Sequence, residues 1–208
     1  MSTTMSLTIG LTIGSSGRGG APAETPSTWN PADKNAAYTL SPSKLTATCA
    51  VAPGQVALRS TLPRTGKRYC EQVVVLNASD SSPSFANSTA SLNAYLGIDT
   101  NGVCLYGANG QVLYNGVSLL ATGTPLAAAE VVGWAYDIPN ALLWVYRGGV
   151  LQNGNPVAGT GGLSVPGIGA SPFMGFWCGF APAETTLRAT AASFTGTIPT
   201  GFVAWDPA

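Results

Sequence analysis

The sequence predicts an all-β protein, an antiparallel sandwich of two β-sheets with an extended N-terminal arm, on three observations. Short runs of apolar, β-branched and aromatic residues recur about every eight to twelve residues, separated by Gly, Pro and Asn. Apolar residues at the 3.6-residue spacing of a helix are essentially absent. The 208 residues include 26 Gly and 15 Pro, and only 9% are charged. This composition is typical of a turn-rich β protein.

The clearest strands lie between residues 130 and 151. Two apolar runs, 130–138 and 141–151, are separated by Pro139-Asn140, and Gly148-Gly149 interrupts the second run. This pattern predicts three successive antiparallel strands joined by tight turns. Alternation along the middle strand places on one face Leu143, Val145 and Arg147, and on the other Leu142, Trp144 and Tyr146. Because neither face is plainly polar, we expect this strand to lie mid-sheet, covered on both sides.

Shorter runs of the same kind predict the other strands. They are residues 37–40, 44–50, 55–60, 67–76, 92–99, 103–106, 111–114, 173–180 and 185–192. Hairpin turns are expected at Asn101-Gly102 and Asn109-Gly110, where Asn and Gly tolerate positive φ. The longest irregular stretches are the Ser-rich residues 77–91 and the Gly-rich residues 153–171. Long loops on a rigid sheet are the usual place for binding function.

We divide the chain into an arm with its linker, residues 1–28, and a sandwich domain, residues 29–208. Residues 7–14 repeat Leu-Thr-Ile-Gly, so an extended strand would carry Leu7, Ile9, Leu11 and Ile13 on one face. Residues 15–28, rich in Gly and Pro, are typical of a linker. We expect the arm to be an assembly element that packs on another chain. The alternative is an edge strand docked on its own domain.

The charge balance limits the classes of partner. Nine Lys and Arg balance nine Asp and Glu, no His is present, and the basic residues are scattered singly. We therefore expect no nucleic-acid binding, because that needs clustered cations. No apolar stretch reaches the roughly 20 residues of a membrane-spanning helix, so no membrane insertion is expected. A surface this poor in charge favours burial against partner subunits, although a neutral monomer is the alternative.

The four cysteines point to packing rather than to chemistry. The start of the chain lacks a positively charged segment and a continuous apolar run, so we expect no export signal and folding in a cytoplasm. There Cys49, Cys70, Cys104 and Cys178 would stay reduced, as buried single thiols on strands. No C-x-x-C pair and no His are available, which argues against a zinc site. Oxidation in a particle released from the cell is the alternative.

The residues for catalysis are sparse, and we expect no catalytic residue, no cofactor and no metal. Without His, a His-assisted nucleophile cannot form. A glycosidase needs two facing carboxylates, and Glu71 and Asp137 fit structural hydrogen-bond acceptors better. The Gly-rich residues 159–169 lack the Lys-Ser/Thr of a phosphate-binding loop. Calcium held by a pair of Asp residues is a minor alternative.

Aromatic residues divide into core and candidate contact positions. Trp134, Trp144 and Trp177 lie inside strand patterns, which predicts core packing. Tyr106 and Tyr114 flank the turn at 107–110 and are the better candidates for sugar stacking or partner contact. The full set of candidate ligand-facing loop residues is Tyr106, Asn109, Tyr114, Asn115, Asn153 and Asn155.

Four ordered blocks between residues 29 and 203 resemble the SPRY domain, a concanavalin-like sandwich, in the version found in virion proteins of tailed bacteriophages. The blocks are WNPADKN at 29–35 with TLS at 39–41 and LTAT at 45–48, GKRYCE at 66–71, the segments at 131–137 and 143–146 with the loop at 151–162, and IPTGF at 198–202. The chain departs from the family's pattern at Cys70, at 147–149 and at 192–194, which affects any inherited binding surface.

The resemblance implies a function as well as a fold. We expect a non-enzymatic structural protein of the virion, a decoration, neck, tail or fibre component assembled in the host cytoplasm. It would be anchored by its arm and would contact other virion proteins and copies of itself. The alternative is a host-surface adhesin that recognises a glycan or a surface protein through loops 77–91, 107–116 and 153–171.

Overall fold

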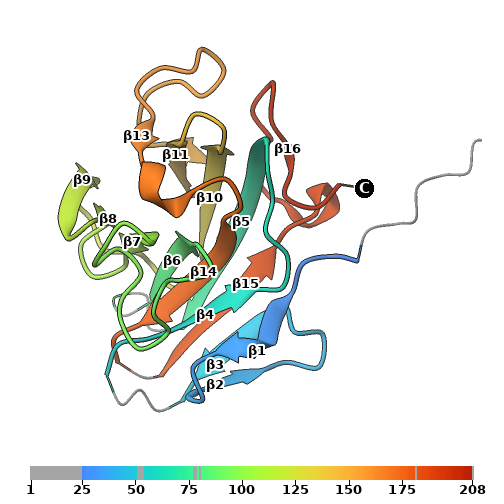
Figure 1. Cartoon of the computed structure of the whole chain (residues 1–208), viewed down its shortest axis with the longest axis vertical. Helices are drawn as coiled ribbons and strands as arrows, with labels where there is room; N and C mark the ends of the chain where they lie inside the picture. Colours follow the sequence, from blue (N-terminus) through green and yellow to red (C-terminus); the bar gives the residue numbers. More distant parts are fainter. Residues whose placement is uncertain (1–24, 51–53, 77–78, 80, 181, 208) are drawn as a thin grey trace, which may run out of the picture.

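The computed structural model describes residues 25–50, 54–76, 79, 81–180 and 182–207 of the chain. These residues form two facing β-sheets (Figure 1). Helix is confined, in this described part, to short 3-10 turns such as Pro166–Ile168 and Ala191–Ser193. The all-β sandwich predicted from the sequence is thus confirmed. The proposed assembly residues Leu7, Ile9, Leu11 and Ile13 lie outside the described residues.

The first sheet has seven strands, and all its neighbouring strands run antiparallel. In spatial order they are β1 (Trp29–Lys34), β4 (Val56–Ser60), β14 (Phe173–Cys178), β6 (Ser81–Ala86), β7 (Gly102–Tyr106), β8 (Gln111–Tyr114) and β9 (Val117–Ala121). The edges of this sheet are therefore β1 and β9, which lie on opposite sides of the molecule in Figure 1.

The second sheet has nine strands. Its main order is β12 (Val150–Leu151), β11 (Leu142–Arg147), β10 (Glu130–Asp137), β5 (Lys67–Leu76), β15 (Ala183–Arg188), β3 (Thr46–Cys49) and β2 (Tyr38–Leu40). Two short strands join it, β13 (Leu163–Ser164) beside β11 and β16 (Val203–Ala204) parallel to β5. The long strands β5 and β10 pair over eight residues and form its centre.

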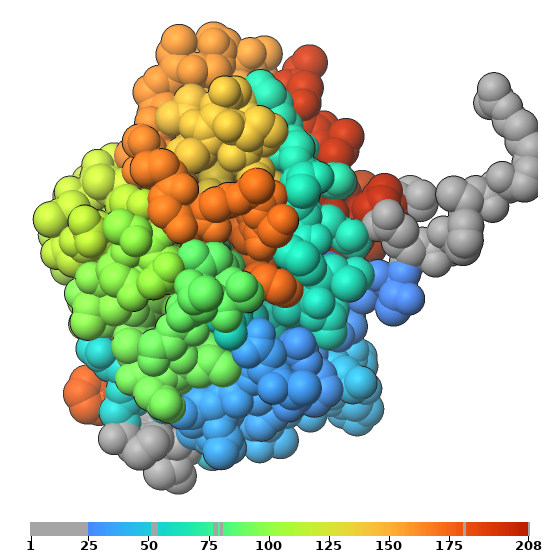
Figure 2. Space-filling view, viewed as in Figure 1, coloured from blue at the N-terminus to red at the C-terminus, as the bar shows by residue number. Residues whose placement is uncertain are grey.

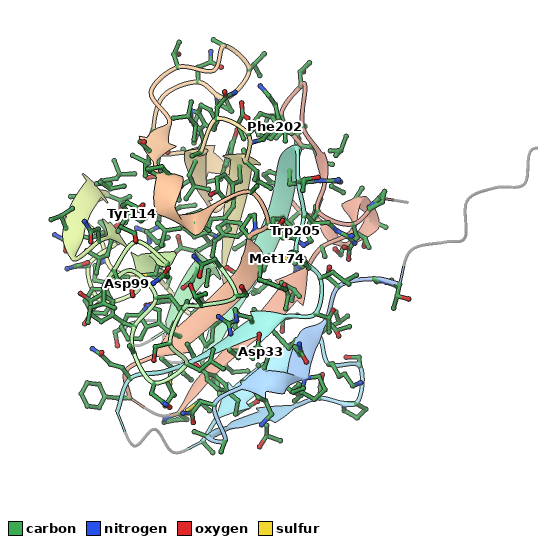
Figure 3. The ribbon with its side chains drawn as sticks, in the orientation of Figure 1. Asp33, Asp99, Tyr114, Met174, Phe202 and Trp205 are labelled. Atoms are coloured by element: carbon green, nitrogen blue, oxygen red, sulfur yellow. The ribbon has the colours of Figure 1, made fainter. Side chains whose placement is uncertain are left out.

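The core lies between the two sheets and is built around aromatic rings. Phe85 from β6 has its ring centroid 5.6 Å from that of Trp134 and 5.3 Å from that of Tyr136, both from β10. Trp205 packs against the same Phe85 ring at 5.4 Å. Figure 3 shows Trp205 and Met174 in the middle of the molecule, where both are fully buried. Edge-to-face and tilted ring contacts of this kind add to the stabilisation that burial provides.

The three-stranded meander expected at residues 130–151 is present as β10, β11 and β12. Leu143 and Val145 of β11 enter the main core. Trp144 points to the opposite face, where it forms a second cluster with Tyr69 and Phe202. Both faces of β11 are therefore covered, as the alternation predicts. The strand is next to the edge, because only the short β12 and β13 lie beyond it.

The expectation that residues 77–91 form an irregular loop is wrong, because residues 81–86 are the fully buried strand β6. Its Ser hydroxyls find partners inside the protein, which removes the cost of burying them. Ser84 Oγ donates to the carbonyl oxygen of Ser82 (2.6 Å), and Ser82 Oγ accepts the amide N–H of Gly107 (3.3 Å).

The prediction of a strand at residues 92–99 is also wrong, since this stretch is a series of turns. Strands β1 and β9 were not predicted.

The four thiols form no disulfide, and they are buried and located on strands, as predicted: Cys49 on β3, Cys70 on β5, Cys104 on β7 and Cys178 on β14. Burial raises the pKa of Cys49 and of Cys70, and it raises the pKa of Cys104 to about 12. Because the thiolate is the reactive form, these cysteines are poor nucleophiles at neutral pH.

Candidate functional site

The best candidate for a binding site is an aromatic pocket on the outer face of the seven-stranded sheet. Trp177 of β14 and Cys104 of β7 alternate with core residues such as Phe176 and Val103, so they point away from the sandwich interior. The loop before β7 covers this face in part and brings Tyr95 onto Trp177. These residues form a small hydrophobic cluster on the outer face of the sheet, separate from the main core and open to solvent on one side.

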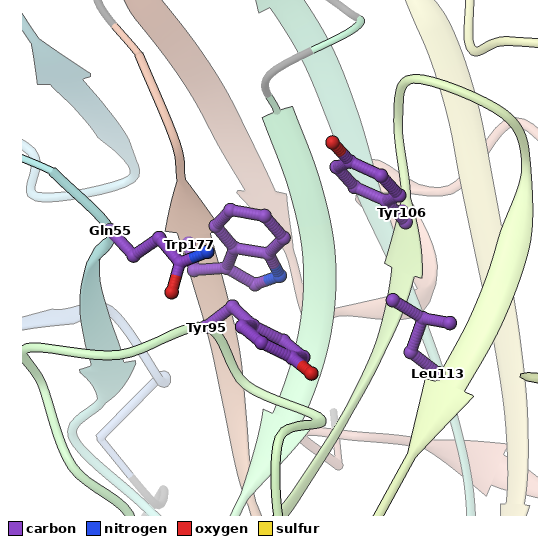
Figure 4. Close-up of a pocket in the computed structure, with 5 residues that line it drawn as sticks. All are labelled: Gln55, Tyr95, Tyr106, Leu113 and Trp177. Atoms are coloured by element: carbon purple, nitrogen blue, oxygen red, sulfur yellow. The ribbon is translucent and has the colours of Figure 1, made fainter. Parts of the chain in front are cut away.

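The pocket has a volume of about 210 Å³ and is lined by Gln55, Tyr95, Tyr106, Leu113 and Trp177 (Figure 4). Tyr106 stacks on Trp177 with ring centroids 5.6 Å apart and an interplanar angle of 18°. Tyr95 lies 5.7 Å from the same indole at 47°. Trp177 is only 3% exposed and forms the floor, whereas Tyr95 and Tyr106 are half-buried and form the walls.

The lining of the pocket determines what it can bind. It carries no charged side chain, and its polar groups are the Gln55 amide, the two tyrosine hydroxyls and the buried indole N–H of Trp177. Figure 4 shows the Gln55 amide beside the Trp177 indole. Aromatic faces with a few polar groups at the rim suit neutral ligands, either the apolar face of a sugar ring or an apolar peptide side chain.

Of the candidate loop residues, Tyr106 lies in the pocket and Tyr114 does not. Tyr114 is paired with Val103 in the register of β7 and β8, so its ring enters the core, where it is 8% exposed. Its hydroxyl accepts a hydrogen bond from Gly167 N–H at 2.8 Å. Tyr114 therefore does not fit the expectation of a ligand-facing residue. The two tyrosines flank the same turn but lie on opposite faces of the sheet.

The candidate asparagines have structural contacts. Asn109 Oδ1 accepts the N–H of Gln111 (3.0 Å), and Asn115 adopts a positive φ of 51° in the turn before β9. Asn153 fastens the following loop to β11, accepting the N–H of Val145 (2.9 Å) and donating to the carbonyl oxygen of Leu143 (3.2 Å).

Asn155 accepts the amide N–H groups of Val157 and Ala158 at 3.0 and 3.1 Å. It also borders a wider hollow of about 480 Å³, together with residues such as Tyr146 and Ile198. The sequence patterns did not identify as contact positions four of the residues that line the aromatic pocket: Gln55, Tyr95, Leu113 and Trp177.

The buried carboxylates are tied to structural partners. Glu71, 1% exposed at its side chain, accepts the N–H groups of Thr195 (2.9 Å) and Gly196 (2.7 Å) and pairs with Arg188 (3.4 Å). It thereby holds the segment after β15 against the sheet. Asp206 pairs with Arg64 at 2.6 Å.

Asp137 is held by Lys67 at 2.9 Å and by Asn140 Nδ2 at 2.9 Å. Burial acts to raise the pKa of Asp137, but the hydrogen bonds from Asn140 and Lys67 and the charge of Lys67 lower it below its ordinary value. Asp137 is therefore held as a carboxylate by its neighbours. A general acid needs a raised pKa instead.

Within the described ranges, no group of three or more His, Cys, Asp or Glu side chains is arranged to hold a metal ion. The same residues include no helix of the length and apolar character needed to cross a membrane.

The two facing sheets define the protein as a β-sandwich. No family model matches the sequence, and no curated protein matches it either. Among solved structures, the SPRY domain of human HERC1 is similar with a TM-score of 0.63 at 8% identity, covering 77% of this chain and 96% of that domain. The PSpry domain of TRIM65 is similar with a TM-score of 0.59 at 14% identity, covering 77% and 90%. The chain thus has the fold of SPRY domains, as its sequence blocks suggested.

Proposed function

We propose that the protein is a non-enzymatic structural component of a tailed-bacteriophage virion, in which the arm anchors the chain and the SPRY-like sandwich is displayed. The resemblance of the four sequence blocks supports the virion setting. The low charge of the chain supports a surface that is partly covered by other virion proteins and by copies of itself.

The proposal that the protein is not an enzyme is supported by the structural role of its buried carboxylates. Glu71, Asp137 and Asp206 are each held by a basic side chain, and each fastens a segment of backbone or a turn. A glycosidase needs two carboxylates that face each other across an open cleft. The open pocket of this domain is instead lined by aromatic and neutral side chains.

The test is incorporation into particles. We expect the full chain to co-purify with intact particles, and a variant lacking residues 1–24 to fold as a β protein but to be absent from them. Far-ultraviolet circular dichroism of the truncated protein is the control for folding. Intact particles that do not contain the full chain, or that incorporate the truncated variant normally, would contradict the proposal.

The aromatic pocket favours a second candidate function, a host-surface adhesin for a neutral glycan or a surface protein. Several copies in a particle would make a weak single site effective. We expect Tyr106→Ala in a multimerised protein to reduce binding to host cells about tenfold or more, because it removes one stacking wall.

The matched control is Phe180→Ala, which removes an aromatic ring that is 69% exposed and does not line the pocket. Binding that is unchanged by Tyr106→Ala, or equally reduced by Phe180→Ala, would exclude this pocket as the adhesive site.

A further inference from the structure

Strand β9 leaves one edge of the seven-stranded sheet open. It pairs with β8 on one side, and no strand of the described chain lies on its other side. Val117, Ser118 and Ala121 are exposed, Val117 to 56%. Figure 2 shows β9 at the left margin of the molecule, at the end of the sheet opposite to the first strand. An open edge of this kind is a template for pairing with another strand.

The other three sheet edges are protected against such pairing. Strand β1 contains Pro31, Asp33 and Lys34, and its register with β4 is irregular. Strand β2 has three residues and β12 has two. Strand β9 has five residues, Val-Ser-Leu-Leu-Ala, with neither a charge nor a proline. It therefore lacks the charges and the proline with which proteins block edge pairing, and its register with β8 shifts once, between Val112 and Leu113.

The turn before β9 fixes which backbone groups point outward. Asn115 and Gly116 both have positive φ, 51° and 73°, which identifies a two-residue type I′ hairpin turn. In such a hairpin the flanking residues Tyr114 and Val117 form a hydrogen-bonded pair. The next residue, Ser118, then directs its N–H and C=O away from β8. These groups are free to pair with an added strand.

The far end of β9 is held by Arg147. Its guanidinium donates to Thr122 Oγ1 (2.9 Å) and to the carbonyl oxygen of Thr124 (2.8 Å), and it pairs with Glu130 at 2.6 Å. Because the segment is fixed at both ends, the open edge is preformed. Binding there has a low cost in conformational order.

We propose that residues 7–13 of a second copy of this chain add as a strand to the outer edge of β9. This inference rests on the proposed role of the arm as the assembly element, and it names the surface on which the arm docks. The segment Leu-Thr-Ile-Gly-Leu-Thr-Ile contains no charge and no proline, and its alternation gives one apolar face. That face would extend the inner face of the sheet beyond Leu119 and Leu120, which already pack against the main core.

The geometry favours a second copy over the chain's own arm. Ser27 is buried and its hydroxyl donates to Asp206 at 2.7 Å, so the tether begins beside β1, at the edge opposite to β9. Six strand spacings separate the edges, about 29 Å in a straight line. Residues 14–26 can extend about 45 Å, but a path to the chain's own β9 must also pass around the sandwich. Between copies, each chain gives one arm and accepts one, which generates rings or filaments.

Sedimentation of the full chain tests this. We expect Ser118→Pro, which removes an outward N–H, to lower self-association by about tenfold or more relative to the unaltered chain. Ser118→Ala is the matched control, because it removes the same hydroxyl but keeps the N–H. A full chain that remains a monomer at high concentration, or a Ser118→Pro protein that associates like Ser118→Ala, would overturn the proposal.

Cross-linking provides a readout that does not depend on the stability of the proline variant. Gly10→Cys and Ser118→Cys chains, mixed under oxidising conditions, should form a disulfide-linked pair at twice the 21.1 kDa chain mass. Val150→Cys, at the exposed edge strand β12, should not cross-link with Gly10→Cys. Equal cross-linking to Val150→Cys would overturn the proposal. So would a Gly10→Cys, Ser118→Cys double variant that links only within one chain. If either result occurs while the chain still enters particles through residues 1–24, the docking surface is wrong and the virion role stands.

Discussion

Gln72 is a side chain that joins the two sheets by polar contacts in the core. It lies on β5 and is fully buried. Its Nε2 donates to the carbonyl oxygen of Gly175 at 2.7 Å, and its Oε1 accepts Ser84 N–H (3.1 Å) and Trp134 Nε1–H (3.2 Å). Gly175 and Ser84 belong to the opposite sheet. A satisfied buried group of this kind fixes how the two sheets pack.

We therefore expect Gln72→Leu to lower the free energy of unfolding by about 3 to 5 kcal/mol, because it leaves three buried polar groups without this partner. Gln55→Leu, at an exposed position, should change it by less than about 0.5 kcal/mol. Urea unfolding followed by tryptophan fluorescence measures both. Equal effects of the two substitutions would show that Gln72 has no such role.

At the same scale, the aromatic residues show how far a sequence can predict a site. Tyr106 was found because it ends a strand beside a turn. Tyr114 met the same criterion, but its register with Val103 places it in the core. Trp177 was expected to be buried, and it is. The sequence does not show on which face of the sheet Trp177 is buried. Alternation along a strand assigns residues to two faces, but it does not show which face packs against the other sheet.

At the scale of elements, Arg147 connects the meander to the segment that follows β9. Burial alone would raise the pKa of Glu130, but hydrogen bonds from Arg147 and from Ala127 N–H, with the charge of Arg147, lower it below its ordinary value of 4.5. A carboxyl group whose pKa is lower in the folded state than in the unfolded state stabilises the fold at pH values above its unfolded-state pKa. That stabilisation is lost as the pH falls through the folded-state pKa.

We expect Glu130→Gln to lower the free energy of unfolding at pH 6 by about 1.5 to 3 kcal/mol, the range for hydrogen bonds to charged groups. The difference from the unaltered protein should shrink as the pH falls below 4.5. In an Arg147→Met background the pH dependence of the same substitution should be smaller, because only the hydrogen bond from Ala127 N–H then lowers the pKa of Glu130. Urea unfolding at several pH values checks this, and a difference that grows on acidification would refute it.

Some strands could be predicted from sequence patterns and others could not. Strand β5 was predicted with its observed bounds, and the meander followed from apolar runs and turn residues. Strand β6 was missed because its Ser residues are typical of loops, and only the folded protein supplies their partners. Strand β9 follows β8 after only the two turn residues Asn115 and Gly116, and it was missed because its apolar run was not assigned to a hairpin.

For the whole molecule, the two-sheet fold was predictable because alternation, turn chemistry and composition all indicate the same class. The position of the pocket was not, since Gln55, Tyr95 and Trp177 are distant in sequence and meet only through the order of the strands. For the N-terminal arm, the segment is evident from the sequence and its binding surface is not. Its pattern is plain in the sequence, whereas its partner surface was inferred from the open edge of a folded sheet.

The most direct test of the virion role is a cryo-electron microscopy reconstruction of purified particles at a resolution that resolves strands. We expect density for this sandwich at a defined, repeated position, with residues 7–13 of a neighbouring copy lying along β9. Particles that lack the sandwich would contradict the proposed function.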